Sequence, residues 1–239
     1  MTDIVVSTAY GDLPAAFGTP DGKGPFPGMV VIHDALGMTP DLQRQVAWLV
    51  GEGFIAIAPD LYSWGGKVRC VVSVIRDAIR RKGRAFDEIE ACRAYLAGHP
   101  DCNGKVGVIG FCMGGGFAMM LITPNHGFQA SSVNYGSLPS DLEDFAATAC
   151  PVVGSFGAKD KSLKGAADRL ETILTKAGVP HDVKEYAEAG HAFLNDHSGE
   201  KLPALVKAMS WMTGGADYHE PSALHARQRI AKFLREHLG

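Results

Sequence analysis

Short apolar runs bounded by turn residues recur along the chain. Runs of this kind are typical of parallel strands that are buried on both faces. They predict strands at 28–33, 54–58, 106–109, 128–134, 151–157 and 181–186. Near the start, segments 3–8 and 13–17 flank the turn Tyr10-Gly11-Asp12, which predicts an opening hairpin.

Apolar residues at helical spacing occupy most of the intervals between these runs. They predict helices at about 39–52, 68–81, 84–97, 163–176 and 221–237. Segment 68–81 is expected to be an amphipathic helix with Arg69, Arg76 and Arg80 on its outer side. Alternating strands and helices with short connections predict an α/β fold, with a mostly parallel central sheet and helices on both faces, in one domain spanning 1–239.

The stretch 105–120, KVGVIGFCMGGGFAMM, has the pattern of a strand, a sharp turn and the start of a helix. At its apex, Gly110-Phe111-Cys112-Met113-Gly114 is a G-x-C-x-G version of the nucleophile elbow. The glycines let neighbouring backbone approach without Cβ clashes, and the helix that starts near Met113 directs N–H groups at the sulfur. The arrangement favours a thiolate and predicts a nucleophile.

Two other roles of this turn stay open at this point. Cysteine is often buried as a small apolar residue, and glycine-rich turns between a strand and a helix also bind phosphate. Neither phosphate-binding pattern, G-x-G-x-x-G or G-x-x-x-x-G-K-[ST], occurs here, and the turn lies in the middle of the chain. Phosphate binding is therefore the weaker alternative.

Composition and charge narrow the range of partners. Hydrophobic residues make up 46% and charged residues 21% of the chain, as in ordinary soluble globular proteins. The net charge is −3 and the longest basic cluster is Arg80-Arg81-Lys82, so neither nucleic acid nor an anionic membrane is an expected partner. A small-molecule substrate is favoured by elimination, and the oligomeric state stays open.

The termini and the cysteines bear on location and metal binding. The first residues, MTDIVVSTAYGD, lack the segments of a signal peptide, and glycines interrupt the longest apolar run, 106–122. The five cysteines form an odd set without a C-x-x-C pair, which argues against a disulfide framework and structural zinc. No H-E-x-x-H motif occurs, so no metal site is expected. We expect a cytoplasmic protein with reduced thiols.

A thiol nucleophile needs a base, and the base needs an acid that orients it. Asp160 follows the predicted strand 151–157 and His191 follows 181–186, so a parallel sheet brings both to the edge where Cys112 lies. Taken alone, Asp160 has the features of a helix cap, and His191 those of a structural histidine. In this chain order and with the elbow, they predict a catalytic triad.

These motifs resemble the dienelactone hydrolase family of the α/β-hydrolase fold, over nearly the whole chain. The resemblance rests on the elbow G-F-C-M-G-G, the histidine motif G-H-A-F, the Asp downstream of the elbow and the chain length. It implies that Cys112 is the nucleophile, His191 the base and Asp160 the orienting acid. It also implies an oxyanion hole formed by the N–H groups of Ala35 and Met113, and no cofactor.

The resemblance extends to the surroundings of the thiol. Asp34 stands where family members usually have Glu, an acid that interacts with the resting thiol, so Asp34 is implied as a shorter thiol-gating acid. Family enzymes for dicarboxylate lactones hold the substrate carboxylate with arginines, one of them shortly after the catalytic histidine. Here that region reads Phe193-Leu194-Asn195. We therefore expect a neutral ester or lactone to be preferred over a carboxylated one.

The candidate substrate-binding residues are Arg76, Arg80, Arg81, Phe193 and Trp211. The three arginines could turn inward from their helix and restore carboxylate binding, whereas Phe193 offers an apolar contact. Trp211 belongs to 202–218, which looks like an insertion that could cover the cleft as a lid.

The implied function is hydrolysis of a carboxylic ester or lactone through an acyl group on Cys112, similar to carboxymethylenebutenolidase. Two alternatives stay open. The chain could be a non-catalytic binding protein that uses Cys112 as a redox-responsive thiol, or an acyltransferase with an acceptor other than water.

Overall fold

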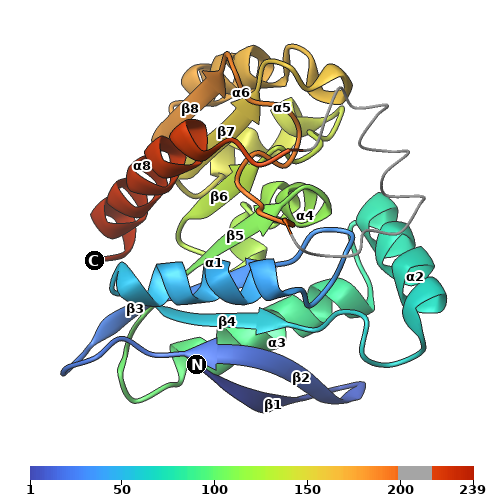
Figure 1. The fold of residues 1–239 in the computed structure, drawn as a ribbon, viewed down its shortest axis with the longest axis vertical. Coiled ribbons are helices and arrows are strands. Elements are labelled where there is room, and N and C mark those ends of the chain that lie inside the picture. The colour runs from blue at the N-terminus through green and yellow to red at the C-terminus, as the bar shows by residue number, and fades with distance from the viewer. Residues whose placement is uncertain (199–216) are drawn as a thin grey trace.

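The structure, a computed structural model, describes residues 1–198 and 217–239 (Figure 1). In this part of the chain, eight strands form one sheet in the order β1-β2-β4-β3-β5-β6-β7-β8. β1 and β2 form an antiparallel hairpin, β2 is antiparallel to β4, and all further neighbours are parallel. The strands are β1 (Thr2–Thr8), β2 (Gly11–Gly18), β3 (Phe26–Ile32), β4 (Ile55–Pro59), β5 (Cys102–Phe111), β6 (Ser131–Asn134), β7 (Val152–Gly157) and β8 (His181–Tyr186).

The helices follow the predicted alternation, with one short addition that the periodicity did not predict, α5. They are α1 (Pro40–Gly51), α2 (Lys67–Arg80), α3 (Arg84–Ala97), α4 (Met113–Met120), α5 (Leu142–Phe145), α6 (Ala166–Ala177) and α8 (Glu220–Leu238). The hairpin and the mostly parallel α/β sheet are confirmed.

Both faces of the sheet are covered by helices, as predicted. In β3, Met29 and Val31 pack in the core under α1 and α8, the two helices in front of the sheet in Figure 1. Their neighbours Val30 and Ile32 pack in the second core, on the side of α3, α4 and α6. Because successive side chains of a strand point to opposite faces, a strand covered on both sides has to be apolar throughout.

Helix α2 does not pack in the way that its amphipathic pattern suggests. An amphipathic helix ordinarily buries its apolar side. That expectation is wrong for Val72, Ile75 and Ile79, which are 62%, 47% and 78% exposed. The buried side of α2 carries Cys70 and Val74 together with Asp77, whose Oδ2 accepts a hydrogen bond of 3.2 Å from the N–H of Ala85 in α3. Arg69, Arg76 and Arg80 are on the outer side, as predicted.

The carboxyl ends of the parallel strands meet at one edge of the sheet, the side on which α2 lies in Figure 1. The loops that follow β3, β5, β7 and β8 carry Asp34, Cys112, Asp160 and His191. No helix in the described ranges combines the length with the apolar character needed to cross a bilayer.

Candidate active site

Cys112 occupies a strained corner between β5 and α4. Its φ is 54° and its ψ is −111°, a conformation that costs energy for a residue with a side chain. A Cβ at Gly110 would lie 1.9 Å from the carbonyl oxygen of Gly114, and a Cβ at Gly114 would lie 2.3 Å from that of Ile32. Only glycine permits this close approach, so the predicted elbow geometry is present and the thiol lies at the N-terminus of α4.

His191 and Asp160 are brought together from separate loops. Nδ1 of His191 lies 2.6 Å from Oδ2 of Asp160, whose side chain is buried. The other carboxylate oxygen accepts hydrogen bonds from the N–H and the hydroxyl of Ser162, at 2.9 and 2.5 Å. Burial opposes ionisation of Asp160, but the bonds from His191 and Ser162 lower its pKa below the ordinary value. An ionised Asp160 fixes Nδ1 as a donor and leaves Nε2 for the reaction.

The second neighbour of His191 is Cys112. Burial lowers the tendency of His191 to be charged, but hydrogen bonds to Asp160 and Cys112, together with the charges of both groups, raise its pKa to about 10. Near neutral pH, His191 therefore carries a proton on its imidazole ring, beside the sulfur of Cys112. A protonated imidazole in this position can act as a proton donor.

The two residues implied for the oxyanion hole line the same cleft as Cys112 and His191. Ala35 follows β3, and Met113 is the first residue of α4, where a backbone N–H has no partner within the helix. Tyr62 joins the two segments, since its hydroxyl lies 3.5 Å from the Ala35 carbonyl oxygen and 3.6 Å from the Met113 sulfur. The sequence analysis did not identify Tyr62, because it comes from the loop after β4.

The cleft beside Cys112 has a volume of about 490 Å³ and is mainly apolar. One wall consists of the loops that carry His191, Tyr135 and Ser162. The opposite wall is α2, which contributes Ile75 and Ile79, two of its three exposed apolar side chains. The apolar side chains on the cleft include Val71, Ile75, Ala78, Ile79, Met113, Met120, Leu138 and Leu163.

Of the three predicted arginines, only Arg81 lines this cleft. Arg76 lies on a separate hollow of about 690 Å³ on the other side of α2, and its Nη2 donates to the hydroxyl of Ser73. Arg80 lies on a further hollow together with Tyr10. The expectation that Arg76 and Arg80 could face the substrate is therefore wrong for this structure.

The prediction for Phe193 is also wrong. Its side chain is fully buried, with ring centroids 5.6 Å from Tyr135 and 5.0 Å from Tyr186. It packs in the same core as α1, and the next residue is bonded to that helix, since Nε2 of Gln45 donates to the carbonyl oxygen of Leu194 at 2.9 Å. The cleft is apolar, as expected, but α2 and not Phe193 supplies the apolar side chains. Trp211 and residues 202–216 of the proposed lid 202–218 lie outside the described residues, so the roles of Trp211 and of the lid stay predictions.

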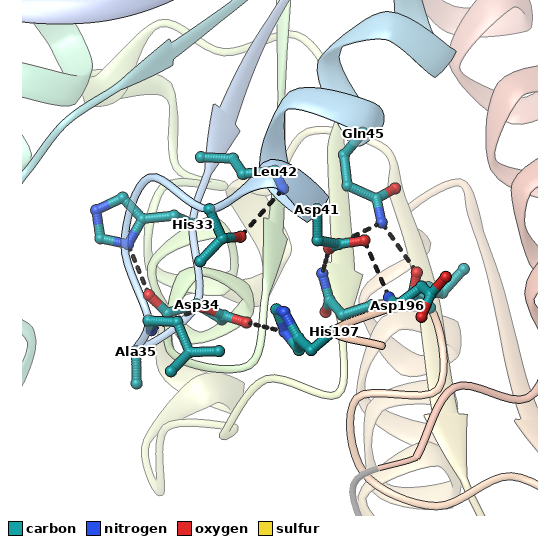
Figure 2. Close-up of polar contacts among 12 residues, drawn as sticks. His33, Asp34, Ala35, Asp41, Leu42, Gln45, Asp196 and His197 are labelled. Carbon is teal, nitrogen blue, oxygen red and sulfur yellow. Dashed lines mark hydrogen bonds and ion pairs between the residues drawn. The ribbon is translucent and has the colours of Figure 1, made fainter. Parts of the chain in front are cut away.

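A buried polar chain supports the loop that carries His191. The Tyr135 ring lies 5.3 Å from that of His191, and its hydroxyl donates to Oδ1 of Asn195. Nδ2 of Asn195 donates to Oδ2 of Asp41 at 2.5 Å, and Asp41 is 1% exposed. Figure 2 shows Asp41 and Gln45 of α1 facing the segment at Asp196. Tyr135 directly follows β6, which is the signal that would have identified it.

Asp34 belongs to a second pair of histidine and carboxylate (Figure 2). Its Oδ2 lies 2.9 Å from Nε2 of His197, and its Oδ1 accepts a hydrogen bond of 2.7 Å from the N–H of Leu36. Both oxygens thus have partners other than the sulfur of Cys112, and a gating role stays a prediction. In residues 1–198 and 217–239, no three His, Cys, Asp or Glu side chains are grouped as a metal ion would require.

Comparison with known proteins shows the family of the chain. The model of the dienelactone hydrolase family matches residues 13–238. A carboxymethylenebutenolidase of Rhodococcus opacus is 30% identical over 197 residues, covering 77% of each chain. One of Pseudomonas putida is 28% identical over 193 residues, covering 77% of this chain and 81% of that enzyme. Among solved structures, a dienelactone hydrolase-like promiscuous phosphotriesterase from metagenomic libraries has a TM-score of 0.80 at 22% identity, over 100% of this chain and 99% of the other.

Proposed function

This chain belongs to the dienelactone hydrolase family and is a hydrolase related to those enzymes, and from this premise we propose that it cleaves a carboxylic ester or lactone through an acyl group on Cys112. The observation that carries the proposal is the placement of His191, which is hydrogen-bonded to Asp160 and lines the same cleft as Cys112. The same cleft contains Ala35 and Met113, whose N–H groups would stabilise an oxyanion.

In the first half-reaction, the thiolate of Cys112 attacks the carbonyl carbon, and the electron pair of the carbonyl moves to oxygen. The N–H groups of Ala35 and Met113 donate hydrogen bonds to that oxygen. The tetrahedral intermediate collapses and the bond to the leaving oxygen breaks. The leaving alkoxide takes the proton of the His191 imidazolium, so His191 ends this step neutral.

Before the second half-reaction, acylation of Cys112 lowers the pKa of His191. Acylation removes the negative charge and the hydrogen bond of Cys112, two of the contributions that raise this pKa, while burial continues to lower it. Neutral His191 then accepts a proton from water as the oxygen attacks the thioester. The thiolate of Cys112 leaves, the acid product departs, and the starting ion pair is restored.

The names of the related enzymes suggest one candidate substrate for this chain. Both curated enzymes named above are carboxymethylenebutenolidases, so the lactone that they hydrolyse is one substrate to assay. The cleft of this chain instead favours an uncharged substrate, because its lining is mainly apolar.

The test is to trap the acyl group. After mixing with an activated aryl ester and rapid acid quench, intact mass spectrometry should show one added acyl mass, and peptide mapping should place it on Cys112. Cys102→Ala, which alters another partly exposed cysteine, should leave the adduct unchanged. An adduct on another residue with steady turnover would remove Cys112 from the mechanism. Products formed only when an alcohol is present would indicate acyl transfer instead of hydrolysis.

A further inference from the structure

Arg81, the only one of the three predicted arginines on the cleft, is held by an acid from another segment. Nη1 of Arg81 donates to Oδ2 of Asp141 at 2.7 Å, and Nη2 donates to Oδ1. The guanidinium also lies over the ring of Phe145, 5.6 Å from its centroid. Arg81 therefore uses both terminal nitrogens within the protein.

This pairing has the geometry that a substrate carboxylate would need. Arginine recognises a carboxylate best through two parallel N–H bonds, and Asp141 already accepts both. Each member of the pair raises the charged fraction of the other, since the pKa of Arg81 is raised by its bond to Asp141 and the pKa of Asp141 is lowered by Arg81. A carboxylated substrate would have to displace Asp141 or approach its negative charge.

The segment that carries Asp141 is held in place independently of Arg81. Nη2 of Arg169 in α6 donates to the carbonyl oxygens of Pro139 and Ser140, at 2.7 and 2.9 Å. Asp141 follows directly and precedes the short helix α5. The acid is thus positioned beside Arg81 by contacts from α6, and its carboxylate is not needed to hold its own loop.

The rest of that side of the cleft is apolar. Ile75 and Ile79 of α2 are exposed and line the same cleft as Cys112, with Leu138 near the Asp141 segment. A substrate group that entered here would leave water for aliphatic side chains, which favours an uncharged chain.

Resting on the proposed function, we propose that the acyl group of the substrate is apolar and lies against α2, and that Asp141 determines this specificity by keeping Arg81 from binding a substrate carboxylate. Asp141 is the specificity-determining residue, and Arg81 is a carboxylate-binding group that Asp141 keeps occupied. The inference goes beyond a preference for neutral substrates, because it predicts that one substitution on the far side of the cleft shifts that preference toward a carboxylated substrate.

The experiment compares 4-nitrophenyl hexanoate with the mono-4-nitrophenyl ester of adipic acid, which has the same leaving group and acyl length but ends in a carboxylate. The variants are Asp141→Asn and Asp141→Asn combined with Arg81→Ala. Asp144→Asn is the matched control, because Asp144 lies on α5, which Asp141 directly precedes, and its substitution removes the same charge. The wild type should favour the hexanoate in kcat/KM.

Asp141→Asn should raise the ratio of kcat/KM for the adipate over that for the hexanoate by about tenfold, the scale of one charge-assisted hydrogen bond. Adding Arg81→Ala should cancel this gain, and Asp144→Asn should leave the ratio near that of the wild type. The proposal is wrong if Asp141→Asn leaves the ratio unchanged, or if Asp144→Asn changes it equally, which would indicate a general effect of charge.

A second measurement separates this inference from the hydrolase proposal. The rates at which N-hexylmaleimide and 6-maleimidohexanoate label Cys112 report the same charge preference without turnover. If the wild type hydrolyses neither ester but Asp141→Asn still favours the carboxylated maleimide, the hydrolase proposal fails and the role of Asp141 stands. If ester turnover is normal and both probes are indifferent to Asp141→Asn, the role of Asp141 fails alone.

Discussion

The two walls of the cleft are built in opposite ways. The loop wall follows β6, β7 and β8, and its polar groups are buried and paired, as in Asp160 with His191 and Asn195 with Asp41. The helix wall is α2, where Ile79 is exposed toward the cleft and has no directional bond to offer.

This difference corresponds to two physical demands. Proton transfer and nucleophilic attack depend on positions within a few tenths of an ångström, which buried hydrogen bonds can hold. Burial of an apolar group depends on area and tolerates changes of shape. We therefore expect substitutions in the loop wall to lower kcat, and substitutions in the helix wall to alter KM and acyl selectivity.

The largest expected effect is that of the nucleophile between the walls. Cys112→Ala should lower the turnover of an activated ester by more than about a thousandfold, since the proposed mechanism forms the acyl intermediate on this thiol. In brief labelling with iodoacetamide, Cys112 should react fastest of the five cysteines. Burial raises the pKa of Cys92 and of Cys150 to about 12, so both stay thiols at neutral pH. Steady turnover by Cys112→Ala would contradict the mechanism.

Next come the catalytic partners in the loop wall. His191→Asn and Asp160→Asn should each lower kcat by about a hundred- to ten-thousandfold, because both proton transfers pass through a correctly oriented imidazole. Circular dichroism at the assay temperature should verify that the variants are folded. The matched control is His197→Asn, which breaks the second pair of histidine and carboxylate on the same loop. If His197→Asn lowers kcat as much as His191→Asn does, the assignment of His191 rather than His197 as the catalytic histidine is contradicted.

A smaller loss is expected behind the loop wall. Tyr135→Phe removes the donor to Asn195 and leaves a buried acceptor without it, which should cost about 1–3 kcal/mol of unfolding free energy. Because Tyr135 also lies against His191, kcat should fall by about tenfold with KM little changed. Urea unfolding and steady-state kinetics measure the two effects. A loss of stability with unchanged kcat would make Tyr135 purely structural.

On the helix wall, substitutions should act on binding. Ile75→Ser and Ile79→Ser should each raise KM for long-chain esters by about three- to tenfold, by loss of apolar contact, and flatten the dependence of KM on chain length. Stability should change by less than about 0.5 kcal/mol, since both side chains are exposed. The control is Val72→Ser, an exposed α2 residue on the other hollow. A fall in kcat with KM unchanged would contradict the contrast between the walls.

The last prediction concerns the pH dependence of stability. Although burial opposes it, Asp160 and Cys112 raise the pKa of His191 from 6.5 to about 10. A pKa that is raised on folding stabilises the folded state below 6.5, and this contribution is lost as the pH rises through about 10. The difference in unfolding free energy between wild type and His191→Asn should therefore shrink across that range. Cys112→Ala should show a weaker dependence, and a difference that grows with pH would contradict the assignment.

Much of the loop wall could be predicted from the sequence. Cys112 lies in a motif whose strand, turn and helix are specified by neighbouring residues, and glycines at 110 and 114 are required by the close backbone contacts. Asp160 and His191 were identified because parallel strands deliver the residues after their carboxyl ends to one edge. The roles of all three in catalysis remain proposals.

The helix wall and the supports of the site could not be predicted in this way. The apolar stripe of α2 identifies side chains that avoid water, but it does not say whether another helix or a substrate cleft covers them. The Tyr135–Asn195 and Asn195–Asp41 bonds join residues 60 and 154 positions apart, and the Arg81–Asp141 pair spans 60. No local pattern specifies such partners.

The sequence by itself determined the order of the elements, the two-sided burial of the sheet and the elbow, because these depend on periodicity and backbone conformation within a few residues. Only the tertiary structure decided that Phe193 is buried, that Ile79 faces the cleft and that Asp141 occupies Arg81. Apolar burial has no direction and ion pairs form with whatever charge lies near, so both depend on how distant segments pack together.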